Sequence, residues 1–342
     1  MDKCAKLLLI VTGSQFSGGA LADCRDVICT VLHQLAPSRT RTCSPTHAAT
    51  MTLRFTTGLS ELDEALGGGL LPGTLTIVAG ATGVGKTQFG LHFLQADVAA
   101  HKPSGAIIDL SSRGDSQHHE GYAQRIFGRT LTSVDVRKDE TRSPFDGGRP
   151  ADIMPFLGYG GKRVLRSQMD TEQWDAWQSE MNRRMPQLFR FVYAHLLHGT
   201  QRFVIDGIEP QQTVGDSLQL DMTELIYHRM LRQEHDWLAR EVLREKYREN
   251  EPQVQEYAYD HTQTATLVLL TTKQMMLEPL MTQPLADGDF AAGANTVILL
   301  GRVPLGQSVG RAMFIAKHRG SYARQDIIPF DINDHGIQLS TD

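Results

Sequence analysis

Short runs of hydrophobic residues recur along the chain and predict buried strands. Five such runs are residues 74–79, 105–110, 202–206, 264–272 and 295–300, which are mostly apolar and rich in β-branched side chains. Continuous apolar runs of this kind are typical of parallel sheets, whose strands are buried on both faces. Helical patterns separate several of these runs. The alternation predicts an α/β fold with a mainly parallel central sheet.

Between the runs, apolar residues return every three or four positions, which predicts helices with one buried face. The predicted helices span residues 57–66, 88–96, 122–127, 171–188 and 221–250. In the first helix, Ser60 is placed to cap the amino end. Large side chains line one face of residues 171–188, and we expect core packing there, with a subunit contact as the alternative: Trp174, Trp177, Met181, Met185 and Leu188.

The amino-terminal part of the chain differs in composition from the rest. It holds all four cysteines: Cys4, Cys24, Cys29 and Cys43. We interpret residues 1–50 as an extension that is poorly ordered or that precedes a true start at Met51. Residues 51–342 are then one domain, with helical insertions at about 113–200 and 215–263.

Residues 80–87 have the spacing G-x-x-x-x-G-K-[ST] between a predicted strand and a predicted helix, which is the context of a phosphate-binding loop. Glycines let the backbone approach a pyrophosphate. The N–H groups of the loop and the positive end of the helix face the phosphates. The sequence therefore predicts a nucleotide site formed by Gly80, Ala81, Thr82, Gly83, Val84, Gly85, Lys86, Thr87 and Gln88.

Three side chains predict how this site holds Mg·ATP. Lys86 can reach the β- and γ-phosphates, and the Thr87 hydroxyl can join the ligand shell of Mg²⁺. The strand at residues 202–206 ends in Asp206, and a parallel arrangement of strands brings this carboxylate to the metal. ATP and Mg²⁺ are the predicted cofactors, with Thr87 and Asp206 as the predicted metal ligands.

The residues around this loop resemble the KaiC-type ATPases of the RecA superfamily. The stretches that carry the resemblance before the loop are Thr57-Gly58-Leu59, Leu62-Asp63, Leu66-Gly67-Gly68-Gly69-Leu70 and Pro72-Gly73. The resemblance covers roughly residues 53–110, 200–210 and 264–340. It implies a three-layer P-loop NTPase fold of the RecA-like kind, with antiparallel strands near the carboxyl terminus.

The resemblance also implies a homo-oligomer, a ring or a filament and possibly a hexamer, with Mg·ATP between subunits. Lys317 and Arg319 lie in a Lys-His-Arg-Gly-Ser stretch that in this family reaches the γ-phosphate of the neighbouring subunit. On a strand both side chains point to the same face, although a surface basic pair is the plainer alternative. The polar residue that follows the strand at 264–272 can sense the γ-phosphate in this superfamily, which makes Gln274 a candidate.

The chain departs from the family where a water-activating carboxylate is expected. The family usually has two adjacent glutamates after the second strand, and this chain has Ser111 and Ser112 there. Asp109 and Asp115 are the nearby substitutes, although neither has the family spacing. The sequence therefore leaves two functions open. The first is an ATP hydrolase, and the alternative is an ATP-binding scaffold or signalling module with negligible turnover.

The charge of the chain bears on whether it binds nucleic acid. The net charge is −5, and residues 274–295 contain three acidic residues and no Lys or Arg. Binding of nucleic acid needs cations to neutralise its phosphates. We therefore expect no strong binding to nucleic acid, and DNA recombination is the less favoured function. The cysteine-free main domain suits a reducing cytoplasm.

No run approaches 18 apolar residues, so we expect no membrane span. The 13 histidines have no metal-binding spacing, and we expect surface or packing roles for them.

Overall fold

The computed structural model describes residues 54–96, 105–111, 118–136, 143–146, 148–157, 169–209, 217–283 and 288–340. They belong to one compact unit, Thr52–Asp342. The predicted extension, residues 1–50, lies outside the described residues. The division into an extension and a domain with two helical insertions stays a prediction.

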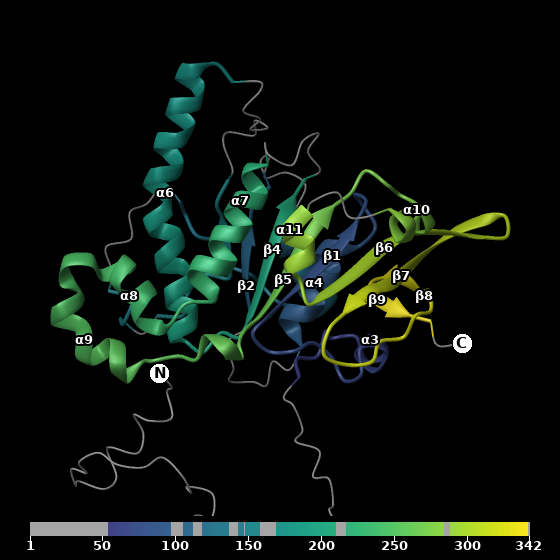
Figure 1. Ribbon diagram of the computed structural model, residues 1–342, viewed down its shortest axis with the longest axis horizontal. Coiled ribbons are helices and arrows are strands. Elements are labelled where there is room, and N and C mark those ends of the chain that lie inside the picture. Colours follow the sequence, from purple (N-terminus) through teal and green to yellow (C-terminus); the bar gives the residue numbers. More distant parts are fainter. Residues whose placement is uncertain are drawn as a thin grey trace, which may run out of the picture. The chain divides into compact units, whose positions relative to one another are not determined.

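A nine-stranded sheet forms the centre of the described residues (Figure 1), in the order β3-β2-β4-β5-β1-β6-β7-β8-β9. The pairs from β3 to β6 are parallel, and the pairs from β6 to β9 are antiparallel. The strands are β1 Thr74–Gly80, β2 Ala106–Asp109, β3 Ile153–Pro155, β4 Arg202–Ile208, β5 Ala265–Thr271, β6 Thr296–Leu305, β7 Ser308–His318, β8 Ile328–Asn333 and β9 Gly336–Leu339. The predicted mainly parallel sheet with antiparallel carboxyl-terminal strands is confirmed.

Helices cover both faces of this sheet, which gives three layers. Alternate residues of a strand point to opposite faces, so Ile77 belongs to one apolar core and Val78 to the other. The first core contains residues of α6 Thr171–Leu197, α7 Leu218–Glu224, α8 His235–Leu243, α9 Tyr247–Glu256 and α10 Leu277–Thr282. The second contains residues of α3 Ser60–Ala65, α4 Lys86–Gln95 and α5 His119–Phe127. The short helix α11, Gly288–Gly293, precedes β6.

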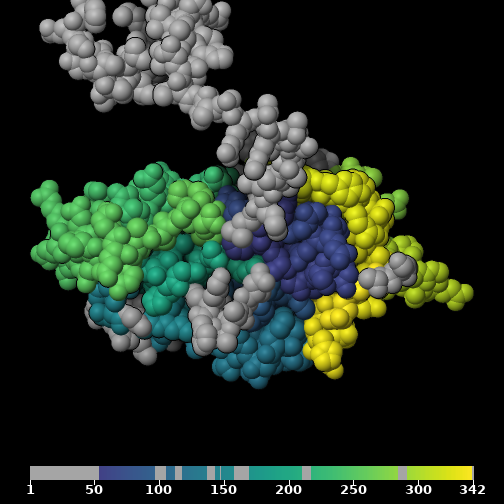
Figure 2. Space-filling model, turned by 90° about the horizontal axis from the view of Figure 1, so that it is seen from below, coloured from purple at the N-terminus to yellow at the C-terminus, as the bar shows by residue number. Residues whose placement is uncertain are grey.

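The view turned by 90° shows parts of the surface by their colours (Figure 2). The green surface around α8 and α9 and the yellow surface of the carboxyl-terminal strands lie on opposite sides of the purple segment that carries α3.

The predicted apolar face of α6 is confirmed as core packing. Trp177, Met181 and Leu188 are buried, and Trp174 and Met185 pack against them.

The predicted helix over residues 221–250 is wrong as one continuous element. The chain forms α7, a π-helix at Leu225–Leu231 and, after a break at residues 232–234, α8. The wider π-helical turn buries Ile226, Tyr227, Met230 and Leu231 together. Arg244 has a positive φ of 50° and ends α8. The helix is therefore interrupted twice, at residues 232–234 and at Arg244, although the alternating charges predict one continuous solvated helix.

Three smaller expectations also need correction. The predicted helix at 171–188 continues to Leu197, because Phe191, Val192 and Leu196 extend its buried stripe. Ser60 does not cap α3, since the Asp63 carboxylate instead accepts the N–H and the hydroxyl of Thr57. The strand β3 was not predicted, because its three residues are too few to show a pattern.

Candidate nucleotide-binding site

The predicted phosphate-binding loop joins the carboxyl end of β1 to the amino end of α4. Gly85 precedes α4 with φ 116°, in the left-handed region, which glycine reaches without strain. Gly83 also has a positive φ, and a Cβ built on it has no atom within 4 Å. Gly80 is different, because a Cβ there would lie 2.4 Å from the Leu300 carbonyl oxygen. The loop therefore has a tightly packed first glycine and an open turn at Gly83.

Lys86 is the first residue of α4, and its ammonium lies over the loop. Its Nζ donates to the Ala81 carbonyl at 2.9 Å. The side chain is buried, and burial lowers the pKa of Lys86 to about 8, while the nearby Asp206 carboxylate acts in the opposite direction. A buried cation beside the open loop is suited to hold phosphate oxygens, whose negative charge would compensate its desolvation.

Thr87 and Asp206 meet at the carboxyl edge of the sheet. The Thr87 hydroxyl donates to Oδ2 of Asp206 at 3.0 Å, and the N–H of Gly207 donates to Oδ1 at 2.6 Å. A hydroxyl and a carboxylate are hard oxygen ligands of the kind that Mg²⁺ takes together with phosphates. The donor set therefore fits the predicted metal. Among the described residues, no group of three or more His, Cys, Asp or Glu side chains forms a separate metal site.

His119 is a buried residue of this site that the sequence did not predict. It is the first residue of α5, and its Nε2 donates to Oδ2 of Asp206 at 3.0 Å. Burial opposes protonation, but the hydrogen bond to Asp206 and the charges of Asp206 and Asp109 outweigh it and raise the pKa of His119. The expectation of a surface position is wrong for His119, which is buried. No spacing in the sequence could have indicated it, because the contact depends on where α5 begins.

Asp109 ends β2, and its Cα pairs in register with Asp206 of β4. Its Oδ1 accepts the N–H of Ser111 at 2.7 Å. Burial is the largest influence and raises the pKa of Asp109. Ser111 is buried next to this carboxylate. Ser112 and Asp115 lie outside the described residues, so of the candidates for the missing glutamates only Asp109 is placed at this edge.

Lys317 and Arg319 lie together, but away from the loop of their own chain. Lys317 Nζ donates to the Ala292 carbonyl at 2.8 Å, and Arg319 Nη2 donates to the same oxygen at 3.2 Å. Lys317 pairs with Val297, whose other neighbour is Ile77. Further along, the Arg319 N–H donates to Asn295, toward the amino end of β1. The phosphate-binding loop follows the carboxyl end of β1, so the pair points to the opposite edge of the sheet.

Gln274 follows β5 on the loop side of the sheet. The N–H of Thr272 donates to the Gly80 carbonyl at 2.9 Å, which sets this segment beside the start of the phosphate-binding loop. The Thr272 hydroxyl donates to the Gln274 carbonyl at 3.1 Å, and the Gln274 side chain is exposed. The structure thus brings the backbone near the site without fixing a contact for the amide.

Gln219 is a second residue that the sequence did not predict. Its buried side-chain amide donates to the carbonyls of Leu110 and Gly207, both at 2.8 Å. Its oxygen accepts the N–H of Glu209 at 2.9 Å. Gln219 lies in the first turn of α7, so this helix ties together the segments that leave β2 and β4 beside Asp109 and Asp206.

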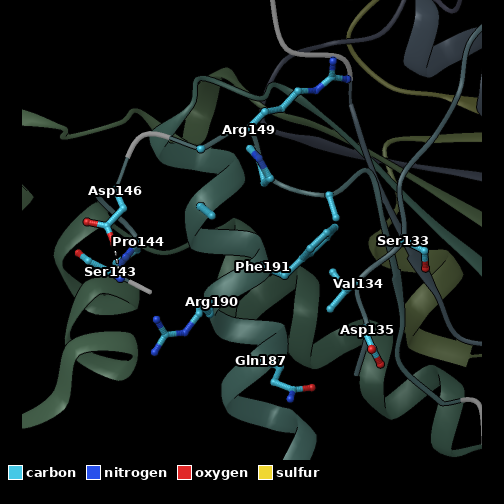
Figure 3. A pocket seen from close by; sticks show the side chains of 14 residues that line it. Ser133, Val134, Asp135, Ser143, Pro144, Asp146, Arg149, Gln187, Arg190 and Phe191 are labelled. Carbon is cyan, nitrogen blue, oxygen red and sulfur yellow. Dashed lines mark hydrogen bonds between the residues drawn. The ribbon is translucent and has the colours of Figure 1, made fainter. Parts of the chain in front are cut away.

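A separate pocket of about 270 Å³ lies between α6 and residues 133–151 (Figure 3). It is close to the amino end of β3 and is not part of the nucleotide site. Arg149 and Arg190 line it, but their guanidinium groups extend to different parts of the view. Arg149 also pairs with Asp152 at 3.0 Å. The two cations therefore do not converge on one anion.

Comparison with known proteins supports the reading of this site. The model of the KaiC ATPase family matches residues 55–128, which contain α3, the phosphate-binding loop, α4, β2 and α5. The predicted resemblance is confirmed over this segment, and at the level of the family it supports an ATP-binding P-loop ATPase. No curated protein matches the chain. The resemblance predicted for residues 200–210 and 264–340 stays a prediction.

Among the described residues, no helix combines the length and the apolar composition that crossing a membrane requires.

Proposed function

We propose that this chain binds Mg·ATP at residues 80–88 and hydrolyses it as a homo-oligomer, with each nucleotide between two subunits. The observation that carries the proposal is the 3.0 Å hydrogen bond from Thr87 to Asp206, two residues that are 119 positions apart. A phosphate-binding loop and a strand-end carboxylate meet in this way where P-loop proteins hold Mg·ATP. The KaiC ATPase match over residues 55–128 supports the same assignment.

Each residue of the site then has a distinct role. The N–H groups of the loop and the amino end of α4 bind the phosphates, and Lys86 contacts the β- and γ-phosphates. Thr87 and Asp206 hold Mg²⁺, which neutralises charge on the phosphates when it is bound. Gln274 is the candidate that senses the γ-phosphate, because its segment begins beside Gly80.

Lys317 and Arg319 complete the site of a neighbouring subunit in this proposal. Both donate to the Ala292 carbonyl at the edge of the sheet opposite to their own loop. They cannot serve that loop, whereas a subunit packed head to tail can present them to the γ-phosphate of its neighbour. Cations so placed stabilise charge that develops during phosphoryl transfer.

Asp109 is the candidate base for the attacking water. It is buried beside Asp206, and burial raises its pKa, which suits a carboxylate that must accept a proton. The buried Ser111 in place of the first family glutamate favours the second candidate function, an ATP-binding scaffold without turnover. The two functions differ in hydrolysis and share nucleotide binding.

The first experiment measures phosphate release with Mg·ATP, next to ATP affinity, for the wild type and the Lys86→Ala and Asp109→Asn variants. We expect turnover in the wild type and no ATP affinity in Lys86→Ala. Asp109→Asn should bind ATP normally and lose at least about a hundredfold in rate, the scale of a lost general base. Tight binding without turnover in the wild type would instead identify a nucleotide-gated scaffold.

A mixing experiment tests the role of the neighbouring subunit. Asp109→Asn, which should still bind ATP, and Arg319→Ala should each be inactive alone. In oligomers mixed at random from equal amounts, the loop and Asp109 of the Arg319→Ala chain can face an intact Arg319 from the Asp109→Asn chain. We expect about a quarter of the wild-type rate to return, because both conditions hold at that fraction of head-to-tail interfaces. A mixed assembly that forms, by light scattering, but stays inactive would rule out this role of Arg319.

A further inference from the structure

His119 belongs to none of the roles described so far, although it touches the centre of the site. Its side chain is 4% exposed. It opens α5, in which Ala123 is buried and the Phe127 ring lies edge-on to the His92 ring of α4 at 5.1 Å between centroids. These contacts pack α5 against the helix that follows the phosphate-binding loop.

The carboxylate of Asp206 accepts hydrogen bonds from three separate elements. Gly207 of β4 donates to Oδ1, whereas Thr87 of α4 and His119 of α5 both donate to Oδ2 at 3.0 Å. The Gly207 N–H adjoins Asp206 in sequence and moves with it. Thr87 and His119 are therefore the two contacts that hold the carboxylate against the rest of the site.

These two contacts are not equivalent once a metal is present. The Thr87 hydroxyl oxygen is a predicted Mg²⁺ ligand, so its orientation is set partly by the metal. His119 has no such second task, and it donates to the same Oδ2 from a separate helix, α5. Hydrogen bonds from outer residues that orient metal ligands commonly account for a tenfold to hundredfold change in metal affinity.

We propose, building on the proposed function, that His119 is a positioning residue of the Mg²⁺ site, whose Nε2–H holds Oδ2 of Asp206 in the orientation that Mg·nucleotide requires. His119 acts through Asp206 and contacts neither the metal nor the phosphates. After β2 the sequence has Ser111 and Ser112 in place of the two adjacent glutamates, and His119 reaches this site from the first position of α5. Loss of its donor should weaken metal binding without weakening the metal-free interaction of the nucleotide with the loop.

The test is a titration of a fluorescent ATP analogue at varied Mg²⁺, with the wild type, His119→Ala, His119→Gln and His119→Asn. A glutamine amide nitrogen can replace Nε2 of histidine as a donor, whereas the shorter asparagine cannot reach Asp206. His118→Ala is the matched control, because His118 is the exposed neighbour. We expect His119→Ala and His119→Asn to raise the half-saturating Mg²⁺ concentration by about tenfold. His119→Gln should restore it, and His118→Ala should resemble the wild type.

Nucleotide affinity in EDTA separates positioning from general stability. We expect it to be equal in all five proteins. An equal loss of affinity with and without Mg²⁺ would show that His119 only supports the fold and would overturn the inference. The same holds if His119→Gln and His119→Asn behave alike, or if His119→Ala binds Mg²⁺ more tightly. Absence of nucleotide binding in the wild type would overturn the proposed function itself, and this inference with it.

Discussion

Asp109 and Asp206 are register partners on adjacent strands, yet their carboxylates have different surroundings. Asp206 accepts donors from Gly207, Thr87 and His119. Asp109 accepts the N–H of Ser111, and burial raises its pKa. Neighbouring carboxylates in unlike environments can take unlike tasks. The difference supports Asp206 as the metal ligand and Asp109 as the proton acceptor in the proposed reaction.

The first glycine of the loop should tolerate no side chain. In Gly80→Ala, the added Cβ would lie 2.4 Å from the Leu300 carbonyl oxygen and 2.9 Å from Cγ1 of Val84. Strands β1 and β6 would have to separate, so we expect a loss of about 3 kcal/mol in the free energy of unfolding. Urea denaturation without nucleotide measures this. Gly83→Ala is the control, because its Cβ meets no atom within 4 Å and only the positive φ costs between about 1 and 2 kcal/mol.

Acid should destabilise the fold through His195 of α6. Its Nε2 donates to the Ala151 carbonyl at 2.9 Å, and Nδ1 accepts the Thr200 hydroxyl at 3.0 Å, so the neutral ring satisfies both contacts. Burial lowers the pKa of His195 to about 4. Between this value and the unfolded pKa of about 6.5, the unfolded chain binds more protons, so stability falls as the pH falls.

At pH 5 this histidine should cost about 2 kcal/mol relative to pH 7. The measurement compares urea denaturation of the wild type and His195→Gln at both pH values. Because other groups titrate in both proteins, the difference in their pH dependence isolates His195. Equal pH dependence in the two proteins would contradict the expectation.

At the scale of elements, the side chain of Gln219 joins α7 to the segments at the ends of β2 and β4. Gln219 bonds to Leu110, Gly207 and Glu209, and no apolar residue of the same size can do so. In Gln219→Leu, two buried carbonyls lose their donor, and we expect the free energy of unfolding to fall by about 2 to 3 kcal/mol. Gln255→Leu, at an exposed position of α9, should change stability by less than about 0.5 kcal/mol. Equal effects would show that the bonds of Gln219 contribute little.

The elements that were predicted correctly are those with a strong local pattern. The buried strands and the phosphate-binding loop each have a pattern that is recognisable within a few residues. The parallel arrangement of the strands follows from their alternation with helices. The breaks around residues 232–234 and at Arg244 were missed because charged residues are equally common within solvated helices. His119 and Gln219 were missed for another reason. Their contacts join segments that are 87 and 109 positions apart, and no local spacing records such a meeting.

At the scale of the whole molecule, the two parts of the proposed site lie at opposite edges of one subunit. The loop lies at one edge of the sheet, and Lys317 and Arg319 point to the other, so one subunit presents two unlike faces. A two-fold dimer pairs each face with itself and would leave both incomplete. We expect Mg·ATP to raise the mass measured by light scattering to that of a ring or filament, and Lys86→Ala to prevent this increase. A stable two-fold dimer that remains at all ATP concentrations would contradict the expectation.

The position of β1 within the sheet also governs when the molecule can fold during synthesis. Its neighbours are β5 and β6, so residues 74–80 stay without strand partners until the ribosome has made residues 265–305. The Ile337 N–H, which donates to Nε2 of His92 in α4 at 3.0 Å, comes later still. The strand that leads into the phosphate-binding loop is thus completed only by strands that are made much later. Nascent chains must keep this apolar strand from aggregating until those partners exist, and the nucleotide can stabilise only a chain that already includes them.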